Sequence, residues 1–316
     1  MNNKTTFLTA LICCALIIVV LINLNKLSNY LSNQLETNPK VVLDTKNEYA
    51  LVQNFDYVQI TNDFIPLSKQ DLKNIIYTTI DSGYKTFTFY CPKEYTKCVE
   101  DITNITNDQE ILTHLNNFVN PYNSFSNIKT TISESGEITL DVKYLYTKEK
   151  INIINKKVDE IIKNNITKEM DDYDKIKAIH DYLINNSKYD VKRNNEHDTT
   201  YDSYTAYGPL IEGYATCNGY TDAMAIFLNK LGYKNFKIAT TPDNENLTGH
   251  IWNAVYVNDR WVHLDVTWDD PVSENGKEYL LHKYFLITDN ELKKADEGEV
   301  VVTEHNYLKS IYSEFL

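Results

Sequence analysis

Cys217 is the residue of this chain best placed for nucleophilic chemistry. The apolar residues after it recur at helical spacing until Gly232, so we expect Cys217 at the N-terminus of a helix. The unpaired N–H groups and the dipole at that end favour a thiolate and can bind a developing oxyanion. A cysteine at a helix start is also common as a buried, inert residue, so the assignment needs partner groups.

Two predicted strands supply such partners. Segments 249–257 and 260–268 are rich in β-branched and aromatic residues, and the Asn-Asp pair between them suits a two-residue hairpin turn. In that register His250 and Asp265 are diagonal neighbours on one face, whereas a three-residue loop would separate them. His263 shares that face, and the register does not exclude it. A thiol, a histidine and a carboxylate make a nucleophile, a base and an orienting group.

The sequence around these residues resembles three ordered motifs of the transglutaminase-like superfamily. They are Tyr207-Gly208-Pro209-Leu210 with Cys217-Asn218-Gly219-Tyr220, then Gly249-His250-Ile251-Trp252-Asn253, then Trp261-Val262-His263-Leu264-Asp265-Val266-Thr267-Trp268. The segments around His180 and Phe285 look like the bacterial branch, and the resemblance covers about residues 172–289. It implies a papain-like α+β fold with Cys217 as nucleophile, His250 as base and Asp265 as its orienting group. It also favours His250 over His263.

The chain concentrates its scarce residue types in the same region. Five of its nine glycines lie between Gly208 and Gly249, and all three tryptophans come soon after. Such a region combines special backbone with rigid aromatic walls, so it predicts a cleft. Tyr204, Tyr207 and the backbone are candidates for a second oxyanion donor. We expect the substrate cleft to be lined by Tyr204, Tyr207, Gly219, Trp252 and Trp268.

The N-terminus predicts a membrane anchor. Residues 5–22 are uncharged and polar only at threonines, and a helix of that length approaches the thickness of a bilayer's hydrocarbon core. No convincing cleavage site follows Ile22, so an uncleaved anchor over residues 1–26 is favoured over a cleaved signal. Residues 27–49 are rich in Asn, Ser and Lys without apolar periodicity, and they predict a stalk.

The remainder predicts two domains. Residues 50–150 read as a small α/β domain with helices near 68–82 and 111–119, a strand at 86–90 and a hairpin over 128–145. A helical run at 148–164 connects the domains. Residues 151–316 hold the transglutaminase-like domain, with its core at 172–289 and a helical run at 174–185. We interpret the isolated histidines His114 and His180 as structural residues.

Cys91 and Cys98 are close in sequence, and an exported chain favours a disulfide between them. The alternative is a pair of free thiols. No second Cys/His pair lies nearby at ligand spacing, so we expect no metal there, and no cofactor.

These features together predict an exported, membrane-tethered thiol enzyme that acts on amides, by hydrolysis or by transamidation. We expect the substrate to be a protein, a peptide or an amide of the cell envelope. We expect the protein to cross the membrane once, with its catalytic domain on the extracellular side. The 44 acidic residues outnumber the 31 basic ones, a net charge of −13, which argues against nucleic acid as a partner. The alternative is a catalytically inactive scaffold of the same fold that binds an envelope partner.

Overall fold

A computed structural model describes residues 20, 21, 23, 24, 26, 41, 43, 45–240, 249–272, 279–297 and 305–315. Contacts divide the chain into two compact units, Met1–Val42 and Leu43–Leu316, and all elements named below belong to the second. Most of the predicted anchor at 1–26, and most of the predicted stalk at 27–49, lie outside the described residues. Among the residues described, no helix combines the length and the apolar character needed to span a membrane.

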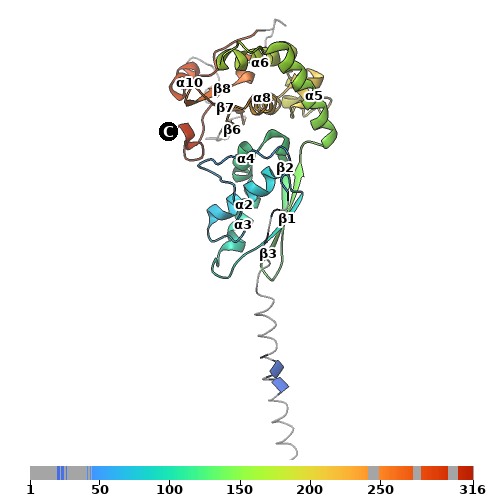
Figure 1. Ribbon diagram of the computed structural model, residues 1–316, viewed down its shortest axis with the longest axis vertical. Helices are drawn as coiled ribbons and strands as arrows, with labels where there is room; N and C mark the ends of the chain where they lie inside the picture. Colours follow the sequence, from blue (N-terminus) through green and yellow to red (C-terminus); the bar gives the residue numbers. More distant parts are fainter. Residues whose placement is uncertain are drawn as a thin grey trace, which may run out of the picture. The chain divides into compact units, whose positions relative to one another are not determined.

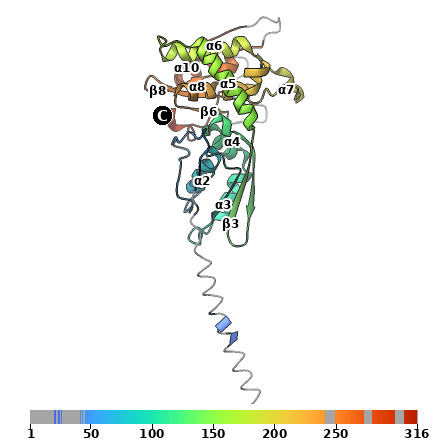
Figure 2. The same ribbon diagram turned by 45° about the vertical axis from the view of Figure 1, so that its right-hand side comes forward.

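The chain first forms an antiparallel sheet with helices on one of its faces (Figures 1 and 2). The strand order is β1-β3-β2, and in β1 Phe87 and Phe89 point into the core. The strands and helices are β1 (Thr86–Tyr90), β2 (Phe125–Ile132), β3 (Glu137–Tyr144), α2 (Lys69–Asp81), α3 (Cys98–Asn107) and α4 (Gln109–Phe118). The predicted helices, strand and hairpin are all present. Helix α3 has no counterpart in the prediction, because its Thr, Asn and Asp residues are weak helix formers.

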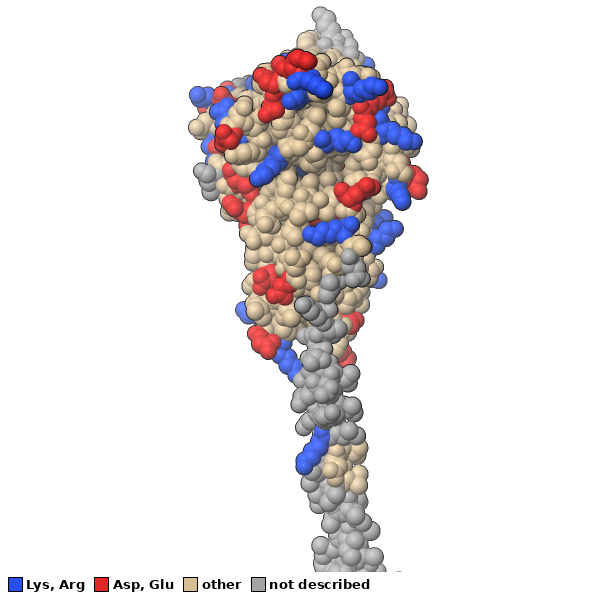
Figure 3. Space-filling model, in the orientation of Figure 1, with Lys and Arg blue, Asp and Glu red and all other residues tan. Residues whose placement is uncertain are grey.

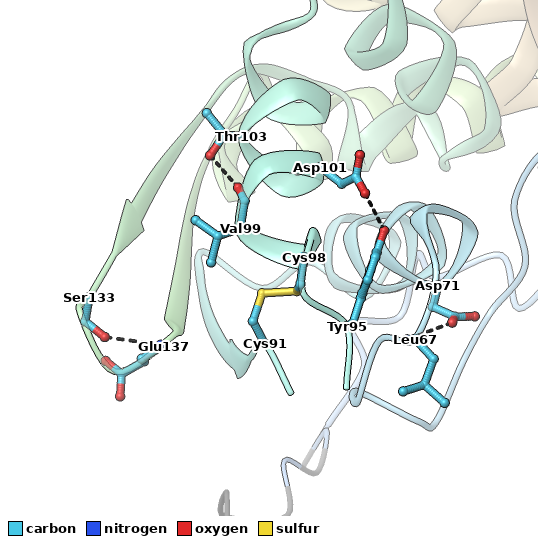
Figure 4. The surroundings of a disulfide bond; sticks show 10 residues. All are labelled: Leu67, Asp71, Cys91, Tyr95, Cys98, Val99, Asp101, Thr103, Ser133 and Glu137. Atoms are coloured by element: carbon cyan, nitrogen blue, oxygen red, sulfur yellow. Dashed lines mark hydrogen bonds between the residues drawn. A yellow bond between two sulfur atoms is a disulfide. The ribbon is translucent and has the colours of Figure 1, made fainter. Parts of the chain in front are cut away.

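A disulfide joins the end of β1 to the start of α3 (Figure 4). Cys91 follows β1 directly, and Cys98 is the first residue of α3 and is buried. Between them, the Tyr95 hydroxyl donates to Asp101 at 2.6 Å, which ties the connecting loop to the helix. The sequence predicts this pairing, and the structure places a disulfide between the same two cysteines.

The second part of the unit is built around helix α8 (Cys217–Leu231). Side chains from Gly219 to Leu228 are buried on every side of this helix, as expected for a helix surrounded by other elements. An antiparallel sheet of order β6-β7-β8 packs against it (Figure 1). The other elements of this part are α5 (Lys148–Asn165), α6 (Asp172–Asn186), β4 (Lys188–Tyr189), α7 (Val191–Glu196), η2 (Gly208–Glu212), β5 (Tyr214–Ala215), β6 (Asn235–Ala239), β7 (Ile251–Val257), β8 (Arg260–Leu264), α9 (Val266–Asp269) and α10 (Asp289–Asp296). Helices and strands are thus mixed, as the α+β prediction requires.

The β7–β8 hairpin has the predicted register. Val257 pairs with Arg260 and Asn253 with Leu264 across a two-residue turn. The turn residues, Asn258 and Asp259, both have positive φ, which is the geometry of a type I′ turn. The predicted second strand is too long, however, because β8 ends at Leu264 rather than at residue 268.

Strand β8 ends early because the next residue begins a helix. The Asp265 Oδ1 atom accepts hydrogen bonds from the backbone N–H groups of Thr267 at 2.8 Å and Trp268 at 3.1 Å. A carboxylate that satisfies the first N–H groups of a helix is a preferred N-cap, and here it starts α9. One carboxylate thus serves both the end of the strand and the site described next.

A buried polar network joins the two parts of the unit. The Lys237 ammonium lies 2.9 Å from Asp222 Oδ1 and 3.0 Å from the Ser124 hydroxyl. The Tyr146 hydroxyl donates to the other Asp222 oxygen at 2.7 Å. Ser124 and Tyr146 come from the first 150 residues, and Lys237 and Asp222 from the remainder. The domain boundary near residue 150 stays a prediction.

Candidate active site

Helix α8 presents a free cysteine at its first turn. Cys217 is the first residue of the helix, as the sequence predicts, and it is partly accessible. The side-chain amide of Asn218 lies 3.8 Å from the Cys217 sulfur. The thiol therefore sits where unpaired backbone N–H groups and a side-chain donor can meet negative charge.

His250 lies between this thiol and a carboxylate. Its Nε2 atom is 2.5 Å from Asp265 Oδ2, and both side chains are buried. Burial lowers the pKa of His250, but the charge and hydrogen bond of Asp265, together with a hydrogen bond to Cys217, outweigh it and hold that pKa well above its ordinary value. Because Nε2 faces Asp265, Nδ1 is the atom left for the Cys217 sulfur. His250 is thus suited to carry a proton beside the thiol.

His263, the other candidate for the base, makes different contacts. His263 accepts a hydrogen bond at Nδ1 from the Trp252 indole at 3.1 Å, and its ring stacks on Phe315 at 4.2 Å. Burial lowers the pKa of His263 to about 3, so the ring is neutral at pH 7. Of the two histidines that the register left open, His250 is the one hydrogen-bonded to Asp265.

A third histidine also reaches Asp265, and sequence reasoning missed it. His305 Nε2 is 3.0 Å from Asp265 Oδ2, and His305 Nδ1 is 2.9 Å from Asp296 Oδ1. Burial lowers the pKa of His305, but hydrogen bonds to both carboxylates more than offset this and raise it. His305 comes 40 residues after Asp265 in a segment without periodicity or motif, so no sequence signal marked it.

Of the residues expected in the cleft, Tyr204 alone lines a cavity with the candidate base. This cavity has a volume of about 400 Å³ and is bounded by Tyr204, Asn218 and His250 among others. Tyr207 instead packs under the Lys150 ammonium, which lies 5.4 Å from its ring centre.

The other three expected cleft residues support the site from within. A Cβ added at Gly219 would lie 2.2 Å from the Ser203 carbonyl oxygen, so this glycine permits close packing of α8. Trp252 is fully buried and stacks behind the His250 ring at 5.7 Å. Trp268 lies against the His305 ring, with 5.4 Å between ring centres. Their contacts are with the framework of the site rather than with the 400 Å³ cavity.

Two side-chain groups within the described ranges bring three potential metal-ligand atoms together, each group within 4.8 Å. One is His250, Asp265 and His305, where the histidines share one carboxylate oxygen. The other is His180, Asp181 and His282. In the second group the Lys177 ammonium also contacts Asp181, which opposes a second cation. Hydrogen bonds among the members account for the spacing of both groups.

Residues 160–266 match the family model of the transglutaminase-like superfamily. The chain contains a transglutaminase-like domain. A comparison with curated proteins found no match.

Two solved structures are similar to parts of the chain. One is described as "Crystal structure of a TGase", with 16% identity, a TM-score of 0.36 and coverage of 61% of this chain and 58% of the other. The second is a "Putative Cysteine Protease" from Cytophaga hutchinsonii, with 13% identity, a TM-score of 0.30 and coverage of 49% and 65%. The chain thus aligns with less than two thirds of either structure. Cys217, His250 and Asp265 all lie inside the matched transglutaminase-like residues, whereas His305 lies outside them.

Proposed function

We propose that this protein is a thiol enzyme that transfers the acyl group of an amide. In this proposal Cys217 is the nucleophile, His250 the general acid and base, and Asp265 the group that orients His250. The observation that supports it best is the position of one buried imidazole, which contacts the thiol and, at 2.5 Å, a carboxylate. The transglutaminase-like match supports the same class of chemistry.

The proposed reaction has two stages. His250 holds the thiol proton at Nδ1, and the Cys217 thiolate attacks the amide carbonyl carbon. The carbonyl oxygen becomes an oxyanion, and the backbone N–H groups at the start of α8 and the Asn218 amide are its candidate donors. The intermediate then collapses, the C–N bond breaks, and His250 returns its proton to the leaving amine. Water or another amine then attacks the thioester carbonyl carbon and gives a proton to His250. The C–S bond breaks, and the Cys217 sulfur leaves as a thiolate beside the protonated His250.

The substrate class in this proposal is a protein, a peptide or an amide of the cell envelope. We also propose that residues 1–26 anchor the chain in a membrane, with the rest on the extracellular side. The Cys91–Cys98 disulfide supports export, because disulfides are rare where thiols are kept reduced. Recovery of the native protein with a new N-terminus between Leu24 and Glu48 would show cleavage instead of anchoring.

The deciding experiment measures the alkylation rate of Cys217 by a small haloacetamide at several pH values. Peptide mapping follows the label, and Cys217→Ala should abolish it. Because His250 and Asp265 support the thiolate, His250→Ala and Asp265→Asn should slow alkylation at pH 7 by about ten-fold or more. His263→Ala is the matched control and should keep the wild-type profile.

Circular dichroism would confirm that each variant is folded. If His263→Ala slows the reaction and His250→Ala does not, the base is misassigned. If none of the variants changes the profile, Cys217 has no coupled base, and the inactive scaffold that binds an envelope partner becomes the better description.

A further inference from the structure

The cavity beside His250 has walls from two parts of the chain. Asn218 and His250 lie on one side, within the matched transglutaminase-like residues. Glu110 and His114, one turn apart on helix α4, lie on another side and come from outside that match. Figures 1 and 2 both show α4 next to β6, at the junction of the two parts. The N-terminal part therefore contributes directly to the surroundings of the candidate active site.

Helix α4 is held firmly against the sheet. The Tyr312 hydroxyl lies 2.8 Å from His114 Nδ1 and accepts a hydrogen bond from the Ala239 backbone N–H at 3.1 Å. The Asn117 amide lies 2.7 Å from the same hydroxyl. These groups are buried. One tyrosine thus links α4 to the end of β6, so the helix that forms this wall has a defined position relative to β6.

The wall carries one carboxylate. Among the described residues that line the cavity, Glu110 is the only acidic one, and its side chain is 54% exposed. Its ion-pair contact is His114 Nε2 at 3.7 Å. Burial lowers the pKa of His114 against the opposing effect of Glu110, so this imidazole is neutral at pH 7. The negative charge of Glu110 is therefore not balanced by its neighbour.

Tyr204 adds an aromatic surface to the same cavity. Tyr204 is 42% exposed and lines the cavity. An aromatic ring attracts a cation through its face, and a carboxylate attracts it through charge and hydrogen bonds. An exposed carboxylate and an exposed ring on one cavity are complementary to an ammonium or guanidinium group.

We propose that Glu110 and Tyr204 form a subsite for a cationic side chain, lysine or arginine, of the peptide whose amide Cys217 attacks. This inference rests on the proposed function, because the subsite lines the same cavity as His250, the proposed base. It gives the N-terminal part a role in substrate selection that lies outside the transglutaminase-like match.

The first test uses the reaction rates of Cys217 with charged reagents to measure the effect of the charge in the cavity. The thiol is modified with two methanethiosulfonates of similar size, a cationic trimethylammonioethyl and an anionic sulfonatoethyl reagent. Glu110→Gln should lower the ratio of cationic to anionic rates by about five-fold, and Glu110→Lys should lower it further. Glu100→Gln is the matched control, because Glu100 is exposed in the first turn of α3, and it should keep the wild-type ratio. An unchanged ratio in Glu110→Gln, or an equal change in Glu100→Gln, would overturn the proposal.

The second test uses peptide vinyl sulfones, which trap a reactive cysteine covalently. Three peptides differ only in one side chain next to the electrophile, which is lysine, norleucine or glutamate. Wild type should react fastest with the lysine peptide, and both Glu110→Gln and Tyr204→Leu should reduce its advantage over norleucine. Equal rates for lysine and norleucine in the wild type would contradict the subsite.

Failure of the subsite can be told apart from failure of the proposed function. The thiosulfonates react with a thiol that has no base, so the rate ratio remains measurable if the His250 test fails. If His250→Ala slows alkylation but Glu110→Gln leaves the ratio of cationic to anionic rates unchanged, the subsite alone is refuted.

Discussion

At the scale of single residues, Asp265 is the centre of the candidate site. Its Oδ1 atom accepts two backbone N–H groups, and its Oδ2 atom faces His250 and His305. His305 is in turn held by Asp296 at 2.9 Å. A carboxylate with this many donors has little freedom to rotate, and its pKa lies well below the usual range although burial opposes this. We therefore infer that His305 is a positioning residue that acts on His250 through Asp265.

We predict that His305→Ala slows the haloacetamide alkylation of Cys217, whereas His305→Gln restores much of the rate. Glutamine keeps one N–H donor for Asp265, and alanine keeps none. On the order of a ten-fold difference between the two variants is expected, because loss of the donor frees the carboxylate that orients His250. Equal rates in the two variants would mean that His305 serves packing alone.

The same variants should differ from wild type in a pH-dependent way. The pKa of His305 is raised in the folded protein, so its protonated form is the one that stabilises the fold. That contribution is fully present below the unfolded value of about 6.5 and is lost as pH rises through the folded value. The gap in unfolding free energy between wild type and His305→Gln should therefore be largest near pH 6 and shrink towards pH 9. Urea unfolding across this range measures it.

The sequence predicts the site residues that are close together along the chain and misses those that come from distant segments. The hairpin register alone brings His250 near Asp265, and the start of α8 follows from apolar spacing. The resemblance implies the same role for Cys217 and favours His250 over His263. Neither source reaches His305 or Glu110, because their approach to the site depends on how distant segments pack together.

At the scale of elements, helix α8 must approach its neighbour closely to place the thiol. The Thr216 backbone N–H donates to the Ser203 carbonyl at 2.9 Å, and Gly219 lies against the same carbonyl. No larger residue fits there without movement of the backbone.

We predict that Gly219→Ala lowers the free energy of unfolding by about 1–3 kcal/mol, because the added methyl group would lie 2.2 Å from a carbonyl oxygen. Gly249→Ala is the control, since a Cβ there meets no atom of the described residues within 4 Å. Equilibrium unfolding in urea measures both variants. Equal losses in the two would show that the space around Gly219 relaxes freely.

The elements also show where sequence patterns stop being informative. The helices with clear apolar stripes, such as α5 and α6, are predicted within a few residues of their bounds. Strand β6 has no prediction, because all five of its residues are buried and it therefore lacks alternation. The end of β8 is missed because one side chain, Asp265, changes the local structure by capping α9.

At the scale of the whole molecule, the excess of acidic residues does not form one continuous acidic surface on the face that Figure 3 shows. The face shown in Figure 3 carries acidic and basic side chains interspersed. Charge on that face therefore favours solubility over steering of a charged partner, and any selection of a cationic substrate depends on local groups such as Glu110.

The two parts of the unit are joined through a buried charge, and this leads to the last prediction. Lys237 and Asp222 are only 3% and 6% exposed at their side chains, and the Lys237 ammonium also contacts Ser124 of the other part. Removing one member of such a pair leaves the other charge buried without its partner, which typically costs about 3–5 kcal/mol. Lys237→Met should therefore lower the free energy of unfolding by about 3 kcal/mol. The control is Lys230→Met, because Lys230 pairs with Asp159 where both side chains are exposed and such pairs contribute about 1 kcal/mol or less. Urea unfolding followed by circular dichroism compares them, and similar losses in both variants would show that the buried pair does not hold the two parts together.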